Sequence, residues 1–412
     1  MRLKDLGYLY SGLTGKAGAD FAIEDPAQGK TFVPFTNIFN NFRVDVGNVR
    51  LVAMTKGEVQ NRVETGDILF LMSSEDYESI GKPSVVSDKV GELYLNSFCR
   101  GLRITRSEVC PDYVAYYLSA ESVRQLLRLE ARGFTRINLK IDRLASQEVL
   151  LPKLSVQRQI VAYLDEKAAA IDARVAVLEK KLAAYRRLKA SVINRAVTRG
   201  LDPKTKLKDS GVDWIGKVPS GWVAGRFKDV AMVRANLVAP DLYMDYPQIA
   251  PENIEKGTGK LQGYGTVRES GIISGNHLFK KGQIIYSKIR PILNKLVITD
   301  FDGLCSADMY PIDVLGDLRF VFYQMLAPVF VNQVAAIVGM RVKMPKINQE
   351  ELSAVGMVIP PLVEQRAIAD YLDAECAKID KAAELVTREI ELYRKLKRSL
   401  INEVVTGKRA VA

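Results

Sequence analysis

The side chains that most often build metal sites and proton relays are scarce in this sequence. It has one histidine, His277, so neither a two-histidine metal site nor a relay of separate histidines can form. The neighbouring Gly275-Asn276 predicts that His277 is a solvated turn residue. No Cys-x-x-Cys spacing occurs, so the four cysteines are expected to fill small gaps in apolar cores in a reducing compartment. They are Cys99, Cys110, Cys305 and Cys376. We therefore expect no metal site.

Basic side chains offer a different chemistry. The 412 residues include 59 Lys and Arg against 48 Asp and Glu, a formal charge of +11 with a pI near 9.3. A basic excess favours polyanionic partners, most simply nucleic acid, through phosphate contacts and counterion release.

The candidate DNA contacts are basic and amide residues in loops between expected strands. Arg can bridge guanine O6 and N7, Asn can pair with adenine, and Lys mostly meets phosphate. For each residue, a solvated surface charge is the competing interpretation. The first half offers Lys82, Arg103, Arg132, Arg136, Asn138 and Lys140. The second half offers Ser287, Lys288, Arg290, Asn294, Lys295, Arg341, Lys343 and Lys346.

The sequence segments expected to position these residues occur twice in the chain. Residues 151–198 return at 359–406 without a gap, at a constant offset of 208, with about 20 of some 49 aligned positions identical. Both copies carry Pro-x-Leu-x-x-Gln-Arg, then Tyr-Leu-Asp, Ile-Asp and Tyr-Arg-x-Leu-Lys-x-Ser-x-Ile-Asn. The chain is therefore interpreted as a tandem duplication.

Each repeated block predicts one long helix of about 33 residues, about 50 Å long. Apolar residues recur every 3.5 positions over about four heptads, which is typical of a coiled coil. A helix buried in an ordinary bundle is the alternative. The expected seam residues are Leu164, Ile171, Val175, Leu178, Leu182 and Tyr185, then Leu372, Ile379, Ala383, Val386, Ile390 and Tyr393.

The segments before the helices repeat more faintly. Gly66-Asp67 and Gly282-Gln283 each predict a glycine turn that enters a short buried strand. Short strands punctuated by Gly and Pro, with a helical stretch at 113–129, indicate compact α/β domains. The predicted fold class is α+β (mixed). Its parts are a first domain at 1–150, a first long helix at 151–200, a linker and second domain at 201–358, and a second long helix at 359–412.

If the two helices pair antiparallel, a pseudo-twofold axis relates the two domains, and one chain mimics a symmetric dimer. On B-DNA such a pair of readers addresses two half-sites at a fixed separation. Because the domains differ in sequence, the target is expected to be asymmetric and bipartite. The helices would then act as a ruler for an unread spacer.

These repeated blocks resemble the conserved regions of the specificity subunit of type I restriction–modification systems. The string Lys208–Trp222, with Trp-Ile-Gly followed by proline and tryptophan, is the most specific part of the resemblance. In the first half Lys4-Asp5-Leu6 matches Lys228-Asp229-Val230, and no counterpart of this string precedes it.

The resemblance implies a non-catalytic subunit with no cofactor of its own. Its partners would be double-stranded DNA, two modification (methyltransferase) subunits and restriction (translocase–nuclease) subunits, which would hold S-adenosylmethionine, ATP and Mg. The sequence lacks the Asn- or Asp-Pro-Pro-aromatic loop of an adenine methyltransferase, so we expect no catalytic residue. With no apolar run of about 18 residues and no secretory leader, the chain is expected to be cytoplasmic, without a membrane partner. The alternative function is a coiled-coil scaffold that binds proteins.

Overall fold

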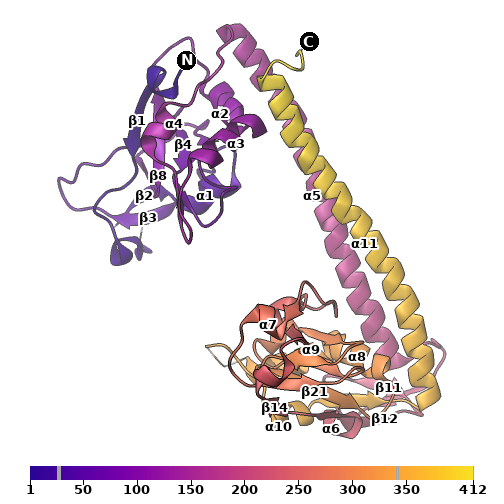
Figure 1. Cartoon of the computed structure of the whole chain (residues 1–412). Coiled ribbons are helices and arrows are strands. Elements are labelled where there is room, and N and C mark those ends of the chain that lie inside the picture. The colour runs from indigo at the N-terminus through magenta and orange to yellow at the C-terminus, as the bar shows by residue number, and fades with distance from the viewer. Residues whose placement is uncertain (26–28, 340, 342, 412) are drawn as a thin grey trace. The chain divides into compact units, whose positions relative to one another are not determined.

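The computed structural model describes residues 1–25, 29–339, 341 and 343–411. They divide into two compact units. The first unit comprises Met1–Leu178 and Arg388–Ala412, and the second comprises Glu179–Thr387. Each unit holds one globular domain and part of both long helices, α5 (Leu154–Arg199) and α11 (Leu362–Val405) (Figure 1).

Each domain is built around a four-stranded antiparallel sheet with the same order. The order is β1-β8-β4-β6 in the first unit and β13-β21-β18-β19 in the second. The strands are β1 (Gly7–Ser11), β4 (Ile68–Leu71), β6 (Pro83–Val85) and β8 (Cys99–Ile104), then β13 (Ala231–Val233), β18 (Ile284–Ser287), β19 (Leu296–Ile298) and β21 (Met309–Val314). This shared order confirms that the domains, and not only the helices, are duplicated.

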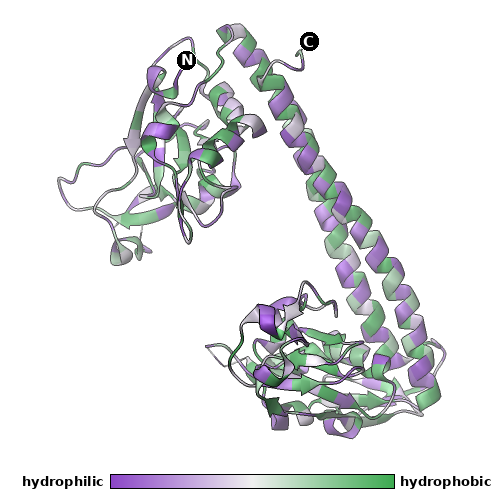
Figure 2. Ribbon diagram, in the orientation of Figure 1, coloured by the Kyte–Doolittle hydropathy of each residue, from purple (hydrophilic) through white to green (hydrophobic). Residues whose placement is uncertain are grey.

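The predicted glycine turns lead into the buried strands β4 and β18. Gly66 and Gly282 have φ of 92° and 85°, a left-handed conformation that residues with a Cβ rarely adopt. Every residue of β4 and of β18 is buried. In Figure 2 the strands of both domains are largely hydrophobic.

A second sheet in each domain has diverged further. It is ordered β3-β2-β7 in the first unit and β14-β17-β20-β15-β16 in the second, and each contains one parallel pair, β2 with β7 and β15 with β20. The strands are β2 (Gly29–Val33), β3 (Arg50–Ala53), β7 (Leu93–Leu95), β14 (Leu237–Val238), β15 (Pro247–Ile249), β16 (Gly265–Thr266), β17 (Asn276–Phe279) and β20 (Gly303–Cys305).

Short two-stranded sheets and short helices complete the domains. The paired strands are β5 (Ser73–Ser74) with β9 (Ile137–Asn138), β10 (Leu207–Asp209) with β11 (Lys217–Pro219), and β12 (Val223–Arg226) with β22 (Gly356–Ile359). The helices are α1 (Phe35–Asn40), α2 (Pro111–Ser119), α3 (Glu121–Glu130), α4 (Ile141–Ala145), α6 (Phe227–Val230), α7 (Val267–Ser270), α8 (Leu318–Leu326), α9 (Pro328–Val338) and α10 (Gln349–Ser353).

The helical stretch expected at 113–129 is two helices. Ala120 has ψ of 137°, so α2 ends there and α3 begins in a new direction. The same break occurs at Ala327, between α8 and α9. No single helix in the described part of the chain is long and apolar enough to span a membrane. The bent pair α8 and α9 passes that test only when taken together.

The long helices begin earlier than the apolar periodicity predicts. They contain 46 and 44 residues instead of about 33, because they start close to the preceding prolines, at Leu154 and Leu362. Gly200, with φ of 72°, follows the end of α5. At 1.5 Å per residue, each helix is therefore roughly 65–70 Å long.

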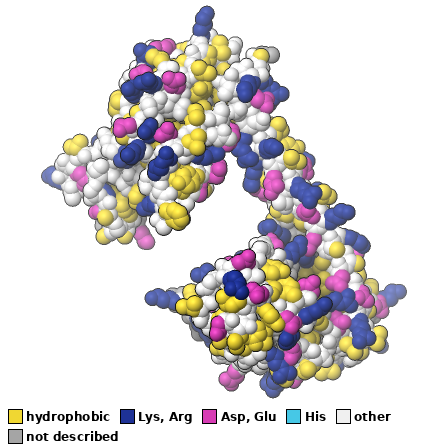
Figure 3. All heavy atoms as spheres, viewed as in Figure 1, with side chains coloured by type: hydrophobic (Ala, Val, Ile, Leu, Met, Phe, Trp, Pro, Cys, Tyr) yellow, Lys and Arg dark blue, Asp and Glu magenta, His cyan; other side chains and the backbone are white. Residues whose placement is uncertain are grey.

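Within each unit the two helices run antiparallel. In the first unit Asp172 pairs with Lys397, and Arg174 with Glu389. In the second unit Lys189 pairs with Asp380. All the predicted seam residues are buried or half-buried, as a seam between two helices requires, whereas the outer faces carry charge (Figures 2 and 3).

Candidate nucleic-acid interface

The duplicated glutamines fix the start of each long helix to its domain. Gln157 lies 1% exposed; its Oε1 accepts a hydrogen bond from the Cys110 amide at 2.8 Å, and its Nε2 donates to the Pro152 carbonyl at 2.8 Å. Gln365 repeats both bonds with Asp317 and Pro360, at 2.9 and 2.8 Å. A buried amide with both ends bonded orients the helix on the domain.

The duplicated asparagines dock the far end of each helix. In the second unit Asn194 of α5 accepts from the Val329 amide in the first turn of α9, at 3.1 Å. In the first unit Asn402 of α11 accepts from the Ser122 amide in the first turn of α3, also at 3.1 Å. Each side chain satisfies an amide at a helix start that has no partner within its own helix. The repeated Ile-Asn motif is therefore a docking contact.

The Tyr-Leu-Asp motif forms a matched contact between helix and domain. Asp165 accepts from the Tyr116 hydroxyl at 2.7 Å, and Asp373 accepts from the Tyr323 hydroxyl at the same distance. An arginine from each domain adds an ion pair, Arg43 to Asp165 and Arg319 to Asp373. Burial and the adjacent carboxylate raise the pKa of both tyrosines, so both hydroxyls stay protonated donors.

The linker string opens the second domain with a buried anchor. Trp222 is 1% exposed and donates from Nε1 to the Glu364 carboxylate of α11 at 2.8 Å. Gly200, at the end of α5, lies against the indole ring. The other tryptophan, Trp214, is 55% exposed.

The late loop of the first domain is a closed hairpin. Arg132 and Asn138 exchange backbone hydrogen bonds of 3.0 and 2.8 Å, and β9 then pairs with β5. Gly133 has φ of 141°, and a Cβ there would lie 2.0 Å from the Arg136 carbonyl. The hairpin tip therefore requires glycine.

The tip of this hairpin presents an aromatic ring between two arginines. Phe134 is 100% exposed. Arg136 lies over the Phe98 ring at 4.5 Å, whereas the Arg132 guanidinium donates to the Leu129 and Ala131 carbonyls at the end of α3. Sequence reasoning named both arginines but missed Phe134. An aromatic residue between two arginines in a glycine hairpin was the available signal.

The remaining candidates of the first domain differ in how far they are exposed and free to contact DNA. Asn138 and Lys140 are exposed beside the hairpin. Lys82 is half-buried, donates to the Phe39 carbonyl and lies 5.4 Å from the Phe39 ring. Arg103 is committed within the domain, because it pairs with the buried Asp67 at 2.8 Å and with Glu64 at 2.6 Å. These carboxylates raise the pKa of Arg103 and neutralise its charge locally.

In the second domain, the two sequence-distant clusters lie together. Ile289 forms a bridge with Lys346, Arg290 donates its amide to the Pro345 carbonyl at 2.8 Å, and Ile347 donates to the Lys288 carbonyl at 3.0 Å. The same arrangement joins β5 to β9 in the first domain. Each domain therefore has one loop surface made from the exit of its central strand and its late loop.

Two candidates of the second domain are internal. Ser287 is 1% exposed and donates to the Ile289 carbonyl, and Asn294 is 4% exposed and donates to the Met325 carbonyl. Among the cations, Arg341 pairs with Glu351, Lys346 with Asp308, and Lys295 donates to the Pro251 carbonyl. Lys288 lies over the Tyr310 ring. Arg290 and Lys343 are exposed.

The scarce residues lie in the interior. His277 is not a solvated turn residue but a buried member of β17, 5% exposed, because its strand pairs with β14 and β20. Burial lowers its pKa. Cys99, Cys305 and Cys376 are buried and Cys110 is half-buried, all as free thiols. Among the described residues, no group of three or more His, Cys, Asp or Glu could hold a metal ion.

Comparison with known proteins identifies the family. The family model for the type I restriction modification DNA specificity domain matches twice, at residues 29–179 and 219–390. This chain belongs to that family. The two matches fall on the two domains and extend along part of both long helices, so they include the contacts of Gln157 and Asp165 and of their counterparts Gln365 and Asp373, and end before Asn194 and Asn402.

Similar proteins carry the same description. The type I restriction enzyme EcoDI specificity subunit of Escherichia coli is 33% identical over 310 residues, which cover 71% of this chain and 69% of that protein. The putative type I restriction enzyme MjaX specificity subunit of Methanocaldococcus jannaschii is 24% identical and covers 98% of this chain and 92% of its own. A solved structure on complex assembly and conformational transition of the type I R-M system contains a chain with a TM-score of 0.68 over 98% of this chain and 96% of that one, at 13% identity. The last comparison shows a shared fold.

Proposed function

We propose that this specificity subunit reads an asymmetric, bipartite DNA target, one half-site with each domain. The proposal rests on one observation: the two domains have the same sheet order and the same paired loop surface, but different side chains on that surface. Side chains that differ on a common frame would read different bases. Among the exposed candidates, Arg136, Asn138, Lys140, Arg290 and Lys343 are the ones we propose for base or phosphate contact.

Phe134 adds a stacking surface to the first domain. An exposed aromatic ring beside arginines can insert at a base step or pack on sugars, as wedges of other DNA-binding proteins do. It would increase the affinity for DNA and change the local shape of the duplex, but it would contribute little to the recognition of individual bases.

The outer faces of the helices support docking of modification subunits. Val177 and Leu188 of α5 are 57% and 48% exposed, and their repeat counterparts Leu385 and Leu396 of α11 are 58% and 49% exposed. Leu392 is 65% exposed. Each unit therefore carries exposed apolar side chains on its helices, which would suit one modification subunit on each unit and further restriction subunits through them. S-adenosylmethionine, ATP and Mg would be held by those partners, and this chain would be non-catalytic.

A domain exchange tests the proposal. Replacing residues 1–150 with the corresponding domain of another specificity subunit should change one half-site and leave the other intact, as measured by methylome sequencing of a host carrying the system. A change in both half-sites, or in neither, would contradict the assignment. The alternative of a protein-binding scaffold predicts no DNA retention at low salt, even with the modification subunit present.

A further inference from the structure

A basic hollow of about 830 Å³ lies in the first unit where the domain meets α11. We call it the first junction pocket. Its cationic lining residues are Lys82, Arg124, Arg128, Lys395 and Arg398. Glu78 and Glu121 also line it, which leaves a formal excess of three positive charges. In Figure 3, Lys and Arg side chains gather on the visible face where this domain meets the helices.

Two cations of this pocket, Arg124 and Lys82, have no direct carboxylate partner among the described residues, although nearby carboxylates partly oppose the lowering of their pKa values. Arg124 is 6% exposed; one Nη donates to the Glu78 carbonyl at 2.7 Å, and the other has no partner in the described part of the chain. Lys82 donates only to a backbone carbonyl. Neither forms an ion pair among the described residues, although buried charges are usually paired. Arg128, by contrast, pairs with Glu78 and Glu121.

These cations also repel one another. Burial lowers the pKa of Arg124 to about 10, with a further decrease from Arg128. Burial also lowers the pKa of Lys82, with further decreases from Arg124 and Lys397. With a pKa of about 10, Arg124 stays charged at neutral pH, so an anion beside it would relieve both the repulsion and the loss of hydration.

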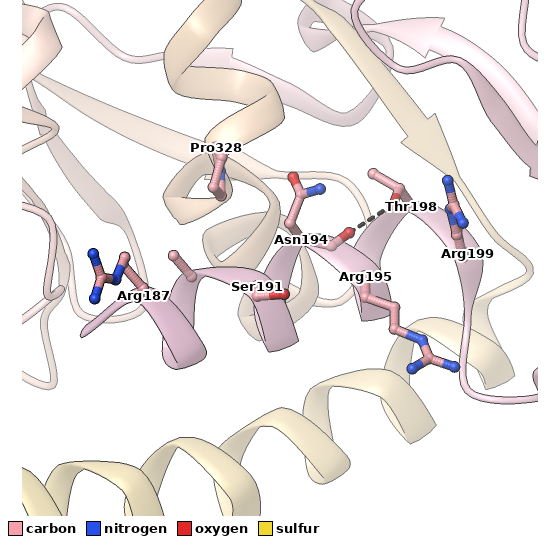
Figure 4. A pocket seen from close by; sticks show the side chains of 8 residues that line it. Arg187, Ser191, Asn194, Arg195, Thr198, Arg199 and Pro328 are labelled. Carbon is pink, nitrogen blue, oxygen red and sulfur yellow. Dashed lines mark hydrogen bonds between the residues drawn. The ribbon is translucent and has the colours of Figure 1, made fainter. Parts of the chain in front are cut away.

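The second unit has a hollow at the equivalent place, the second junction pocket, of about 450 Å³ (Figure 4). Arg187, Ser191 and Asn194 line it, at the repeat positions of Lys395, Ser399 and Asn402. Its other cations, Arg195 and Arg199, come from α5, whereas those of the first pocket come mainly from the domain. Again the formal excess is three positive charges. The positive charge is thus kept at the same place by different residues.

We propose that each junction pocket binds a backbone phosphate of the bound duplex, so that each unit grips DNA independently of its sequence. The proposal rests on the DNA-reading function above. The hollows are far larger than one phosphate, which suits a phosphate carried by a larger molecule. The first pocket also adjoins the proposed reading hairpin: a Cβ at Gly81 would lie 3.1 Å from Leu139, just beyond that hairpin, and 3.4 Å from Arg124.

The test compares two double variants of the full chain in complex with its modification subunits. Lys395→Gln/Arg398→Gln removes two exposed pocket cations, and Lys4→Gln/Lys153→Gln removes the same charge from exposed positions elsewhere in the first unit. We expect the pocket variant to bind target and non-target DNA at least about ten-fold more weakly, with their ratio kept. The slope of log affinity against log salt should fall by about one, because one phosphate contact is lost. The control should match the unmodified complex.

A scan of single neutral methylphosphonates along the target identifies the contacted phosphate. The unmodified complex should lose affinity at one or two adjacent positions, and the pocket variant should no longer respond there. The variant Arg187→Gln/Arg195→Gln should lose its response to the methylphosphonate at a different position in the duplex, the one contacted by the second junction pocket. If the pocket variant still binds the target specifically, with the same salt slope as the unmodified complex, the pocket proposal is wrong and the reading function stands.

Two further outcomes would also overturn the proposal. If the pocket variant instead loses modification subunits on size-exclusion chromatography, the occupant is an acidic protein surface. If no complex distinguishes target from non-target DNA, the reading function itself is wrong, and that result is separable from failure of the pocket alone.

Discussion

At the scale of single residues, the repeated motifs are explained by docking. Gln157, Asp165 and Asn194, with their counterparts 208 residues later, each bond to a domain, and Asn194 and Asn402 also line the junction pockets. These positions are therefore expected to be identical in the two halves, because both halves use the same contacts between helix and domain.

Removing one docking amide should weaken only the unit that contains it. Asn194→Ala leaves the Val329 amide without its partner and should lower the free energy of unfolding of the second unit by about 1 kcal/mol. Asn402→Ala should do the same to the first unit. Hydrogen exchange resolved by peptide measures both; equal loss of protection in both units from either variant would contradict independent docking.

Phe134 should matter for DNA and not for folding. Because its ring is fully exposed, Phe134→Ala should leave the melting temperature unchanged while weakening DNA binding by about 1 kcal/mol. Leu129→Ala, at a neighbouring exposed side chain, is the matched control. Fluorescence of 2-aminopurine placed along the target would report unstacking, and an unchanged signal would exclude insertion.

At the scale of elements, the reciprocal ion pairs set the pairing of the helices. Lys189–Asp380 and Lys397–Asp172 are the same two repeat positions with their roles exchanged. Such a pattern arises only where two copies of one helix pair antiparallel.

The two pairs should differ in strength. Double-mutant cycles with alanine at Lys189 and Asp380 should give a coupling energy of about 0.5–1 kcal/mol, and the cycle at Asp172 and Lys397 should give less. The reason is exposure: the side chain of Asp172 is 61% exposed and that of Asp380 is 28% exposed. Chemical denaturation of each variant measures the coupling, and a larger value at Asp172 would contradict the ranking.

The elements also show what the sequence could predict. The long helices were readable because seam spacing and the offset of 208 are local, repeated signals. The ion pair of Arg103 was not, since Asp67 lies 36 residues away and only sheet pairing joins them. His277 was misplaced for the same reason: its burial comes from neighbouring strands that no local pattern reveals. Which of the candidate cations are already paired depends on tertiary contacts, which the sequence does not show.

At the scale of the whole molecule, helix length should control the spacer of the target. Inserting one heptad at matching positions in both long helices adds about 10.5 Å. At 3.4 Å per base pair, the preferred spacer should lengthen by about three base pairs while both half-sites stay unchanged. Methylome sequencing checks this, and an unaltered spacer would contradict the proposed ruler.

Truncation of the chain should affect the unit farther away in sequence. Removing residues 398–412 takes Leu400, Ile401, Val404 and Val405 out of the core of the first unit. Each such burial contributes about 1.5–3 kcal/mol, so the total is comparable with the stability of a domain. The first unit should unfold while the second keeps its transition. Removing only 408–412 is the control, and loss of the second unit alone would contradict the division.

This division has a consequence for synthesis on the ribosome. The second unit is one continuous segment, Glu179–Thr387, whereas the first needs both the opening of the chain and its last residues. Domains commonly fold in the order in which they are translated. Here the domain made first stays incomplete until residues 388–412 have been made, and the domain made second can finish folding before it.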